Sequence, residues 1–238
     1  MTTLLLVRHA TTAATGSRLG GRTETPLDER GREQAAALAE RLAPLPLKAV
    51  YSSPLARTAQ TAAAIAARHR LEVVCDDGLL EVDYGRWTDR PLKALYRTRL
   101  WPVIAQRPSL VQFPDGESIR GAQQRAVEAV EALVARHPRQ VVAAVTHADV
   151  IKAVVAFYLG LPLDLFQRIA VAPASVTVLR LPPGGQPLLQ RLGDDGPLTP
   201  EAVAPPPRHR SQRGGQTRTA RGSRGRGSSP RGKESSRG

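Results

Sequence analysis

The sequence Leu4-Leu5-Leu6-Val7-Arg8-His9-Ala10 has the pattern of a buried strand that ends abruptly in a cation and an imidazole. A continuous apolar run is typical of a strand covered on both faces, as in a parallel sheet. Ligands of such sheets bind beyond the carboxyl ends of the strands, so Arg8 and His9 lie where a site would form. Alone, an Arg-His pair is more often a strand end that meets solvent, and its significance depends on the rest of the chain.

Length and composition favour one self-sufficient domain, with two small domains as the alternative. The chain has 238 residues, enough to bury a sizeable core without crosslinks. The single cysteine, Cys75, cannot form an internal disulfide, and we expect it to be buried as a small apolar residue in a reducing cytosol. No secretory signal pattern opens the sequence, and no apolar run reaches the roughly 18–20 residues of a membrane span. We therefore expect a cytoplasmic protein with no membrane partner.

Positive charge is concentrated near the C-terminus. Residues 205–238 contain ten Lys or Arg and a single acid, Glu234, and so carry most of the net charge of +13. The segment is rich in Gly and Ser and cannot bury enough apolar surface to offset the entropy of ordering. We predict a folded catalytic domain over residues 1–194 and a disordered, basic Arg/Gly/Ser-rich tail over residues 195–238. Through residues 205–238 we expect at most weak, non-specific contact with a polyanion.

Strand and helix patterns alternate along residues 1–194. Strands are predicted at 4–7, 48–51, 72–75 and 140–145, with a hairpin-like pair at 174–181 and 188–192. Helices are predicted from Asp28 to Pro44, from Ser53 as N-cap with Pro54 in the first position to Arg70, at 117–136 and at 149–159. A loop at 11–26 and an irregular insertion at 76–115 complete the chain. The alternation predicts an α/β fold, a three-layer α/β/α sandwich with a mostly parallel central sheet.

Two of the predicted buried strands each end in a histidine. Because parallel strands place their carboxyl ends on one rim of the sheet, His9 and His147 could face one another. Arg57 falls in the first turn of the helix that follows Ser53, where helix geometry favours an anion. Two guanidiniums and two imidazoles form a receptacle suited to the oxygens of a phosphate dianion. No cluster of His, Cys or carboxylates has metal-ligand spacing, so we expect no metal.

Six blocks of sequence, in order from residue 4 to about 181, resemble the motifs of one protein family. They are Arg8-His9-Ala10-Thr11-Thr12-Ala13-Ala14-Thr15, residues 21–35 with Glu24 in the acidic position, residues 51–62, residues 80–87, Pro114-Asp115-Gly116-Glu117-Ser118, and Val145-Thr146-His147-Ala148-Asp149-Val150-Ile151. One block alone has little specificity, but six at fitting intervals are specific. The chain thus resembles the histidine phosphatase superfamily, also called phosphoglycerate mutase-like.

The resemblance implies a role for each candidate residue. His9 would attack phosphorus to give a phosphohistidine, and Glu81 would act first as general acid and then as general base. Four residues would hold the phosphoryl oxygens: Arg8, Arg57, His147 and Thr15. No cofactor is implied, because the cationic side chains supply the electrostatic stabilisation. Without the family match, Glu81 could equally be an ordinary surface carboxylate.

Three positions depart from the family pattern. Ala10 and Ala148 replace glycines, and a methyl group there could crowd backbone that approaches phosphate. Thr15 replaces an asparagine and keeps only a hydroxyl for the phosphate. Every ionisable role remains filled, so we expect activity. Two further expectations concern residues outside the site: Trp87 and Trp101 pack beneath the insertion, and His69, His137 and His209 have no functional role.

These observations favour a metal-independent phosphomonoesterase that acts on a small phosphorylated metabolite. A phosphoglycerate mutase-type phosphotransferase is the alternative within the family, and the short insertion favours hydrolysis over it. A ribazole phosphatase would belong to the same hydrolytic class. A non-catalytic protein that binds RNA or another polyanion through the tail is the alternative from a different class, although the tail lacks interleaved aromatic residues.

Overall fold

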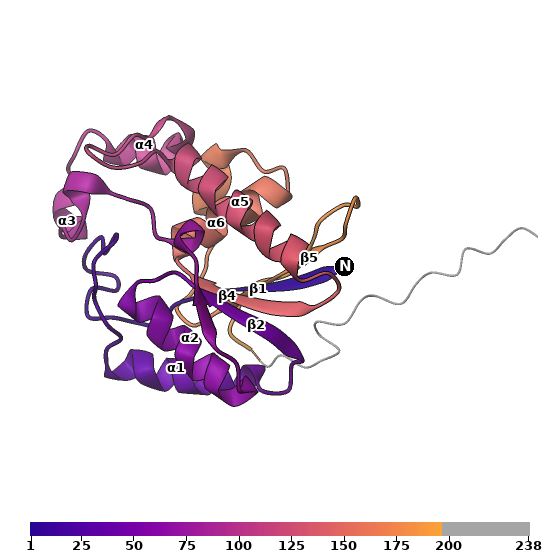
Figure 1. Ribbon diagram of the computed structural model, residues 1–238. Helices are drawn as coiled ribbons and strands as arrows, with labels where there is room; N and C mark the ends of the chain where they lie inside the picture. Colours follow the sequence, from indigo (N-terminus) through magenta and orange to yellow (C-terminus); the bar gives the residue numbers. More distant parts are fainter. Residues whose placement is uncertain (197–238) are drawn as a thin grey trace, which may run out of the picture. The chain divides into compact units, whose positions relative to one another are not determined.

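The computed structural model describes residues 1–196 and is built on a six-stranded sheet of order β3-β2-β4-β1-β5-β6 (Figure 1). The strands are β1 (Thr2–Arg8), β2 (Leu47–Ser52), β3 (Val73–Cys75), β4 (Val141–Thr146), β5 (Val176–Leu181) and β6 (Leu188–Asp194). The first four run parallel to one another, while β5 is antiparallel to both β1 and β6. The mostly parallel sheet and the closing hairpin-like pair are therefore confirmed.

Helices cover both faces of this sheet. In Figure 1, α1 (Glu29–Leu42) and α2 (Ala56–His69) lie below it, and α5 (Ile119–Arg136) and α6 (Ala148–Tyr158) lie above it. Alternate residues of β1 enter the two resulting cores: Leu5 packs in the cluster of α1 and α2, and Leu6 packs in the cluster of α5 and α6. Both side chains are fully buried. This two-sided burial is why the strand is continuously apolar, and it confirms the three-layer sandwich.

The helix starts follow local capping rules in two cases and depart from prediction in a third. Asp28 caps α1 by accepting from the Gly31 N–H at 2.6 Å, and Ser118 caps α5 by accepting from Gly121. The prediction that Ser53 caps α2 is wrong, since the helix begins at Ala56 and Leu55 occupies its N-cap. Ser53 instead continues the sheet, because its N–H donates to the carbonyl of Val145.

The insertion at residues 76–115 is irregular, as predicted. It contains the short helices η1 (Asp77–Leu79), η2 (Gly85–Trp87), α3 (Leu92–Leu95), α4 (Trp101–Gln106) and η3 (Pro108–Leu110). Of these pieces, η2, α3 and α4 share a third apolar cluster with η4 (Leu163–Arg168), whereas Leu79 of η1 packs in the cluster of α5 and α6. Trp87 is buried in the third cluster and Trp101 packs against it, so their predicted packing role is confirmed.

The exposure of Cys75 and the C-terminal tail are the subject of two further predictions. The predicted burial of Cys75 is wrong: its side chain is exposed, because β3 is a three-residue strand at the edge of the sheet. The predicted tail lies outside the described residues except for positions 195 and 196, as does His209. Within residues 1–196, no helix combines the length and the apolar character that crossing a bilayer requires.

Candidate active site

The carboxyl ends of β1 and β4 bring the two histidines together. Arg8 pairs with Thr146 in the parallel ladder, and the His9 N–H donates to the Thr146 carbonyl at 3.0 Å. The next residue on each strand is therefore a histidine, and the ring centroids of His9 and His147 lie 5.2 Å apart. The structure thus places on one rim the pair of imidazoles that the strand pattern predicted.

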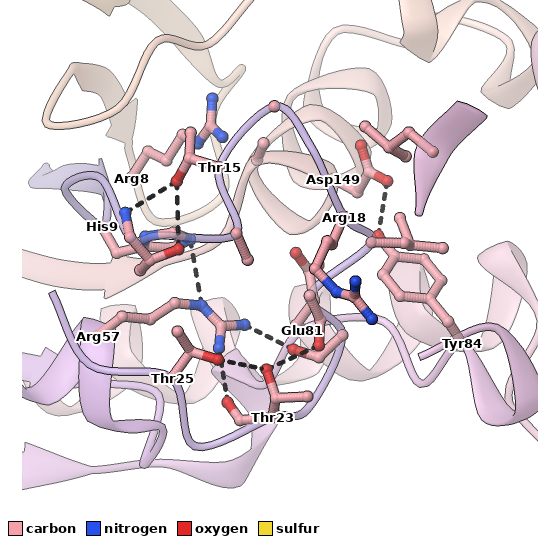
Figure 2. A pocket seen from close by; sticks show the side chains of 18 residues that line it. Arg8, His9, Thr15, Arg18, Thr23, Thr25, Arg57, Glu81, Tyr84 and Asp149 are labelled. Carbon is pink, nitrogen blue, oxygen red and sulfur yellow. Dashed lines mark hydrogen bonds between the residues drawn. The ribbon is translucent and has the colours of Figure 1, made fainter. Parts of the chain in front are cut away.

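A cavity of about 290 Å³ opens at this rim (Figure 2). Five of the six predicted site residues line it: Arg8, His9, Thr15, Arg57 and Glu81. The sixth, His147, is completely buried and lies next to Arg57 rather than on the cavity wall. Four threonines, namely Thr12, Thr15, Thr23 and Thr25, add hydroxyl groups to the wall. The cavity therefore combines fixed cations with neutral hydrogen-bonding groups.

Hydrogen bonding fixes the tautomer of His9. Its Nδ1 lies 2.7 Å from the carbonyl oxygen of Ala10, which can only accept, so Nδ1 carries the proton. The lone pair of Nε2 accepts from Nε of Arg57 at 3.3 Å. Burial, reinforced by Arg57 and Arg8, lowers the pKa of His9 to about 3. The ring is therefore neutral near pH 7, and Nε2 carries a lone pair rather than a proton, as a nucleophile requires.

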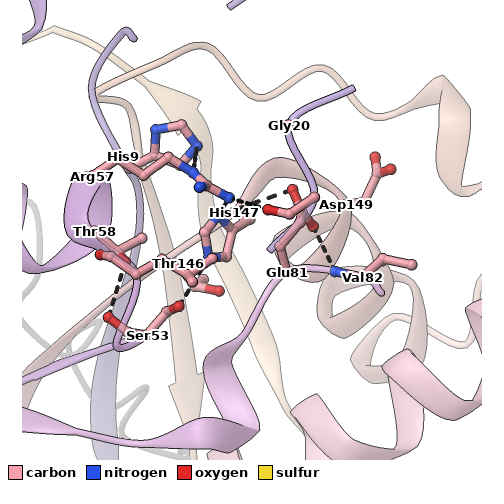
Figure 3. Close-up of polar contacts among 12 residues, drawn as sticks. His9, Gly20, Ser53, Arg57, Thr58, Glu81, Val82, Thr146, His147 and Asp149 are labelled. Carbon is pink, nitrogen blue, oxygen red and sulfur yellow. Dashed lines mark hydrogen bonds and ion pairs between the residues drawn. The ribbon is translucent and has the colours of Figure 1, made fainter. Parts of the chain in front are cut away.

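Arg57 joins the two histidines and the loop at residues 20–25 (Figure 3). Its Nη1 donates to the Thr23 carbonyl at 2.8 Å, and its Nη2 donates to the Gly21 carbonyl at 2.6 Å and to Nδ1 of His147 at 3.2 Å. Because Nδ1 of His147 accepts, the proton of that ring is on Nε2, which donates to Ser53 Oγ at 3.0 Å. Burial and then Arg57 hold the pKa of His147 well below its usual value.

Arg8 and Thr15 present further polar groups at the cavity. Nη1 of Arg8 donates to the Val171 carbonyl at 2.7 Å, whereas its buried Nε has no partner among residues 1–196. A buried guanidinium N–H without a partner is unusual and is suited to an anionic ligand. Oγ1 of Thr15 accepts from the Thr12 N–H at 2.9 Å. Thr15 therefore shapes its own loop as well as lining the cavity.

Glu81 is the buried carboxyl of the site. Its Oε1 accepts from the Val82 N–H at 3.0 Å, and its Oε2 lies 3.9 Å from Nδ1 of His147. Because that imidazole is neutral, the approach is not an ion pair. Burial, with the nearby Asp149 carboxylate adding to it, raises the pKa of Glu81 to about 7. A carboxyl with such a pKa can both give and take a proton at neutral pH.

Sequence patterns alone do not single out several residues of the site. Ser53, predicted to cap a helix, instead accepts from His147. Tyr84 donates to Asp149 at 2.9 Å, and both residues line the cavity. Tyr84 and Asp149 lie within two of the motif blocks, and this is the only feature of the sequence that links them to the site. Glu24 contacts the start of α2, where its carboxylate accepts a hydrogen bond from the Ala56 N–H at 3.1 Å.

The two glycine-to-alanine departures fit the backbone. Ala10 is fully buried in the cluster of α1 and α2, and neither Ala10 nor Ala148 has a positive φ. Ala148 is the first residue of α6 and lines the cavity. The expected crowding by a methyl group therefore finds no support from backbone conformation at either position.

The arrangement is suited to phosphoryl chemistry. Two guanidiniums, Arg8 and Arg57, face a cavity that also holds a neutral imidazole and a carboxyl of raised pKa. These are the groups required to bind a phosphoryl dianion, to attack it and to protonate a leaving oxygen. Over residues 1–196, no three His, Cys, Asp or Glu side chains gather in a way that could hold a metal ion.

Comparisons with known proteins agree with this description. Residues 4–195 match the family model of the histidine phosphatase superfamily (branch 1). Phosphoserine phosphatase 1 of Hydrogenobacter thermophilus is 33% identical over 187 residues, covering 76% of this chain and 87% of the relative. A probable phosphoglycerate mutase GpmB of Proteus mirabilis is 30% identical over 186 residues, covering 74% and 84%. The solved structure of Bacillus stearothermophilus YhfR aligns with a TM-score of 0.78 at 31% identity, covering 82% of this chain and 98% of that one.

Proposed function

The chain belongs to the histidine phosphatase superfamily, and we propose that it hydrolyses a small phosphomonoester through a phosphohistidine at His9. The observation that carries the proposal is the state of the His9 ring. Its Nε2 is unprotonated and lies 3.3 Å from Nε of Arg57, and His9 lines a cavity together with Arg8, Arg18 and Arg57. This geometry suits a nucleophile beside the site that would bind its target.

In the first step, Nε2 of His9 would form a bond to phosphorus while the ester P–O bond breaks. Glu81, protonated at the start, would give its proton to the leaving oxygen, so that the alcohol departs neutral. Arg8, Arg57 and Thr15 would bind the phosphoryl oxygens as charge shifts during transfer. His147 acts with Arg57, to which it is hydrogen-bonded. We also propose that His147 contacts the phosphoryl group, as the family resemblance implies.

In the second step, water would attack the phosphohistidine. The Glu81 carboxylate would take a proton from that water, the N–P bond would break, and inorganic phosphate would leave. Glu81 then returns to its acid form and His9 to its neutral form, so the cycle closes without a cofactor. The raised pKa of Glu81, about 7, is suited to both proton transfers.

Cavity size supports a small substrate. A volume of about 290 Å³ holds a phosphoryl group and a leaving group of a few heavy atoms. Phosphoserine fits this description and is in the name of the relative with 33% identity. The mutase alternative differs in one respect: a mutase would return the phosphoryl group to the substrate instead of passing it to water.

A metabolite screen tests the proposal. The full chain, assayed in EDTA, should release phosphate from p-nitrophenyl phosphate and from one or more small phosphomonoesters, and His9→Ala should abolish release. Transfer to 3-phosphoglycerate without phosphate release would favour the mutase. No turnover of any phosphomonoester, or turnover that needs added metal, would contradict the proposal.

We propose a second function for the basic tail, binding of a polyanion. Ten Lys or Arg within residues 205–238 would attract a polyanion by counterion release, and binding would fall steeply with salt. A full-length variant with those ten residues changed to Gln should lose binding to single-stranded RNA but keep phosphatase activity. If wild-type binding to RNA is absent at low salt, the tail proposal is wrong.

A further inference from the structure

The backbone that carries Glu81 is held by side chains along its whole length. The four consecutive carbonyls of residues 78–81 each accept a side-chain hydrogen bond. Nη1 of Arg125 donates to Gly78 and Leu80, at 2.8 and 3.0 Å. Thr146 Oγ1 donates to the carbonyl of residue 79 at 2.6 Å, and Nε of Arg22 donates to that of residue 81 at 3.0 Å. Since no strand or long helix orders this segment, these side chains determine its path.

One carboxylate oxygen connects the two arginines. Oε1 of Glu117 accepts from Nη2 of Arg22 at 3.2 Å and from Nη2 of Arg125 at 2.8 Å. The same oxygen accepts from the Asp83 N–H at 2.8 Å, and the Glu117 N–H donates back to the Asp83 carbonyl. A side chain at the neighbouring Gly116 would collide with that carbonyl, so the two segments are in close contact.

Arg22 also connects this network to the phosphate-binding candidates. The residues on either side of it, Gly21 and Thr23, provide the carbonyls that accept from the Arg57 guanidinium. The backbone around Arg22 therefore fixes Arg57, and its side chain fixes the carbonyl of Glu81. Arg22 is therefore one of the residues that join the two sides of the cavity wall.

The orientation of the Glu81 carboxyl depends on this backbone. The carboxyl accepts a hydrogen bond from the N–H of its own neighbour, Val82, so a shift of the segment moves the carboxyl with it. Without the charge of Glu117, the guanidiniums of Arg22 and Arg125 would have no shared anion and would repel one another. We infer, on the basis of the function proposed above, that Glu117 is a positioning residue. It holds the Glu81 carboxyl where it can reach the leaving oxygen of a phosphoryl group bound to Arg57.

Two substrates with different leaving groups distinguish positioning of Glu81 from a general contribution of Glu117 to the stability of the fold. An alkyl phosphate such as O-phosphoserine needs a proton from Glu81, whereas p-nitrophenolate departs with little assistance. Glu117→Gln keeps the size of the side chain and removes its charge. We expect it to lower kcat/KM, which reports the steps up to phosphoenzyme formation, roughly 10- to 100-fold on O-phosphoserine and less than about threefold on p-nitrophenyl phosphate. The matched control is Glu128→Gln on α5, whose carboxylate accepts from Gln124 on an exposed face, and it should change neither rate.

A second variant tests the same role if Glu117→Gln is poorly stable, and a double variant tests whether Glu117 acts through Glu81. Arg22→Gln breaks the link to the Glu81 carbonyl while leaving Glu117 paired with Arg125, and it should show the same selectivity. In a Glu81→Gln background, Glu117→Gln should cause no additional loss on O-phosphoserine, because it acts through Glu81.

Equal losses on both substrates, additive losses in the double variant, or unchanged kinetics would each overturn the positioning role. A wild-type chain that hydrolyses neither substrate would instead overturn the phosphatase proposal itself. The two failures are therefore distinguishable in one set of assays.

Discussion

Nε2 of His9 lies 3.3 Å from Nε of Arg57 and accepts a hydrogen bond from it. Two consequences follow for the proposed chemistry. The guanidinium disfavours a proton on the ring, which is part of why the pKa of His9 falls to about 3. The same guanidinium lies beside the atom that would be phosphorylated, where it can stabilise the charge of the transferred group. One contact thus supports both the nucleophile and its target.

Replacing Arg57 by lysine should therefore affect transfer strongly. Lysine keeps the charge but cannot donate at once to Gly21, Thr23 and both histidines, as the guanidinium does. We expect kcat/KM on p-nitrophenyl phosphate to fall about 10²- to 10³-fold. Arg68→Lys, an exposed position on the same helix, is the control and should change kcat/KM little. A loss below about threefold for Arg57→Lys would contradict the role assigned to the guanidinium.

The two proton transfers assigned to Glu81 should respond to pH in opposite directions. With a pKa of about 7, Glu81 is the acid needed for step one at lower pH and the base needed for step two at higher pH. In rapid-quench measurements with O-phosphoserine, formation of the phosphoenzyme should decline above this pKa. Its hydrolysis should decline below it. Glu81→Gln should remove both dependences, and profiles centred near the ordinary glutamate value would contradict the assignment.

Burial of Glu81 should also appear in stability. Its pKa is raised in the folded chain from 4.5 to about 7, so the folded state holds the proton more tightly than the unfolded state. The resulting stabilisation is full below the unfolded value and is lost as pH rises through the folded value. Glu81→Gln should therefore match the wild-type Tm near pH 4 and exceed it by roughly 2–8 °C near pH 8. A Tm difference that does not change with pH would show that the carboxyl is not buried as described.

Ala10→Gly tests whether the departure from the family pattern has a structural basis. The Ala10 methyl is fully buried in the cluster of α1 and α2, so its removal leaves a small gap and adds chain entropy. We expect a loss of about 1–2 kcal/mol in the free energy of unfolding and no gain in kcat. Urea denaturation and steady-state kinetics measure the two effects. A more active variant would show that the methyl group does crowd the site.

Strand ends are the part of the site that sequence patterns predict well. A continuous apolar run that stops at a polar residue marks the rim of a parallel sheet, and this pattern alone predicts that His9 lies near His147. The predicted position of Arg57 near a helix start is also correct, although the helix begins at Ala56 rather than Ser53. Glu81 lies in irregular backbone, so only the family resemblance indicates it.

Contacts made by loop backbone cannot be predicted in this way. The acceptors for Arg57 are the backbone carbonyls of Gly21 and Thr23. Because every residue has such a carbonyl, only the conformation of the loop determines which of them point toward Arg57. The hydrogen bond from Asp83 to Glu117 spans 34 residues and leaves no periodic pattern. The burial predicted for Cys75 is wrong because an edge strand and a central strand look alike over three residues.

Trapping the phosphoenzyme tests the central claim most directly. The full chain is mixed with ³²P-labelled phosphomonoester, quenched in alkali and digested, and the labelled peptide is sequenced by mass spectrometry. We predict an acid-labile, alkali-stable phosphoryl group on the peptide that contains His9, present in Glu81→Gln and absent in His9→Ala. Phosphate release that continues in His9→Ala, or a label on any other residue, would contradict the account.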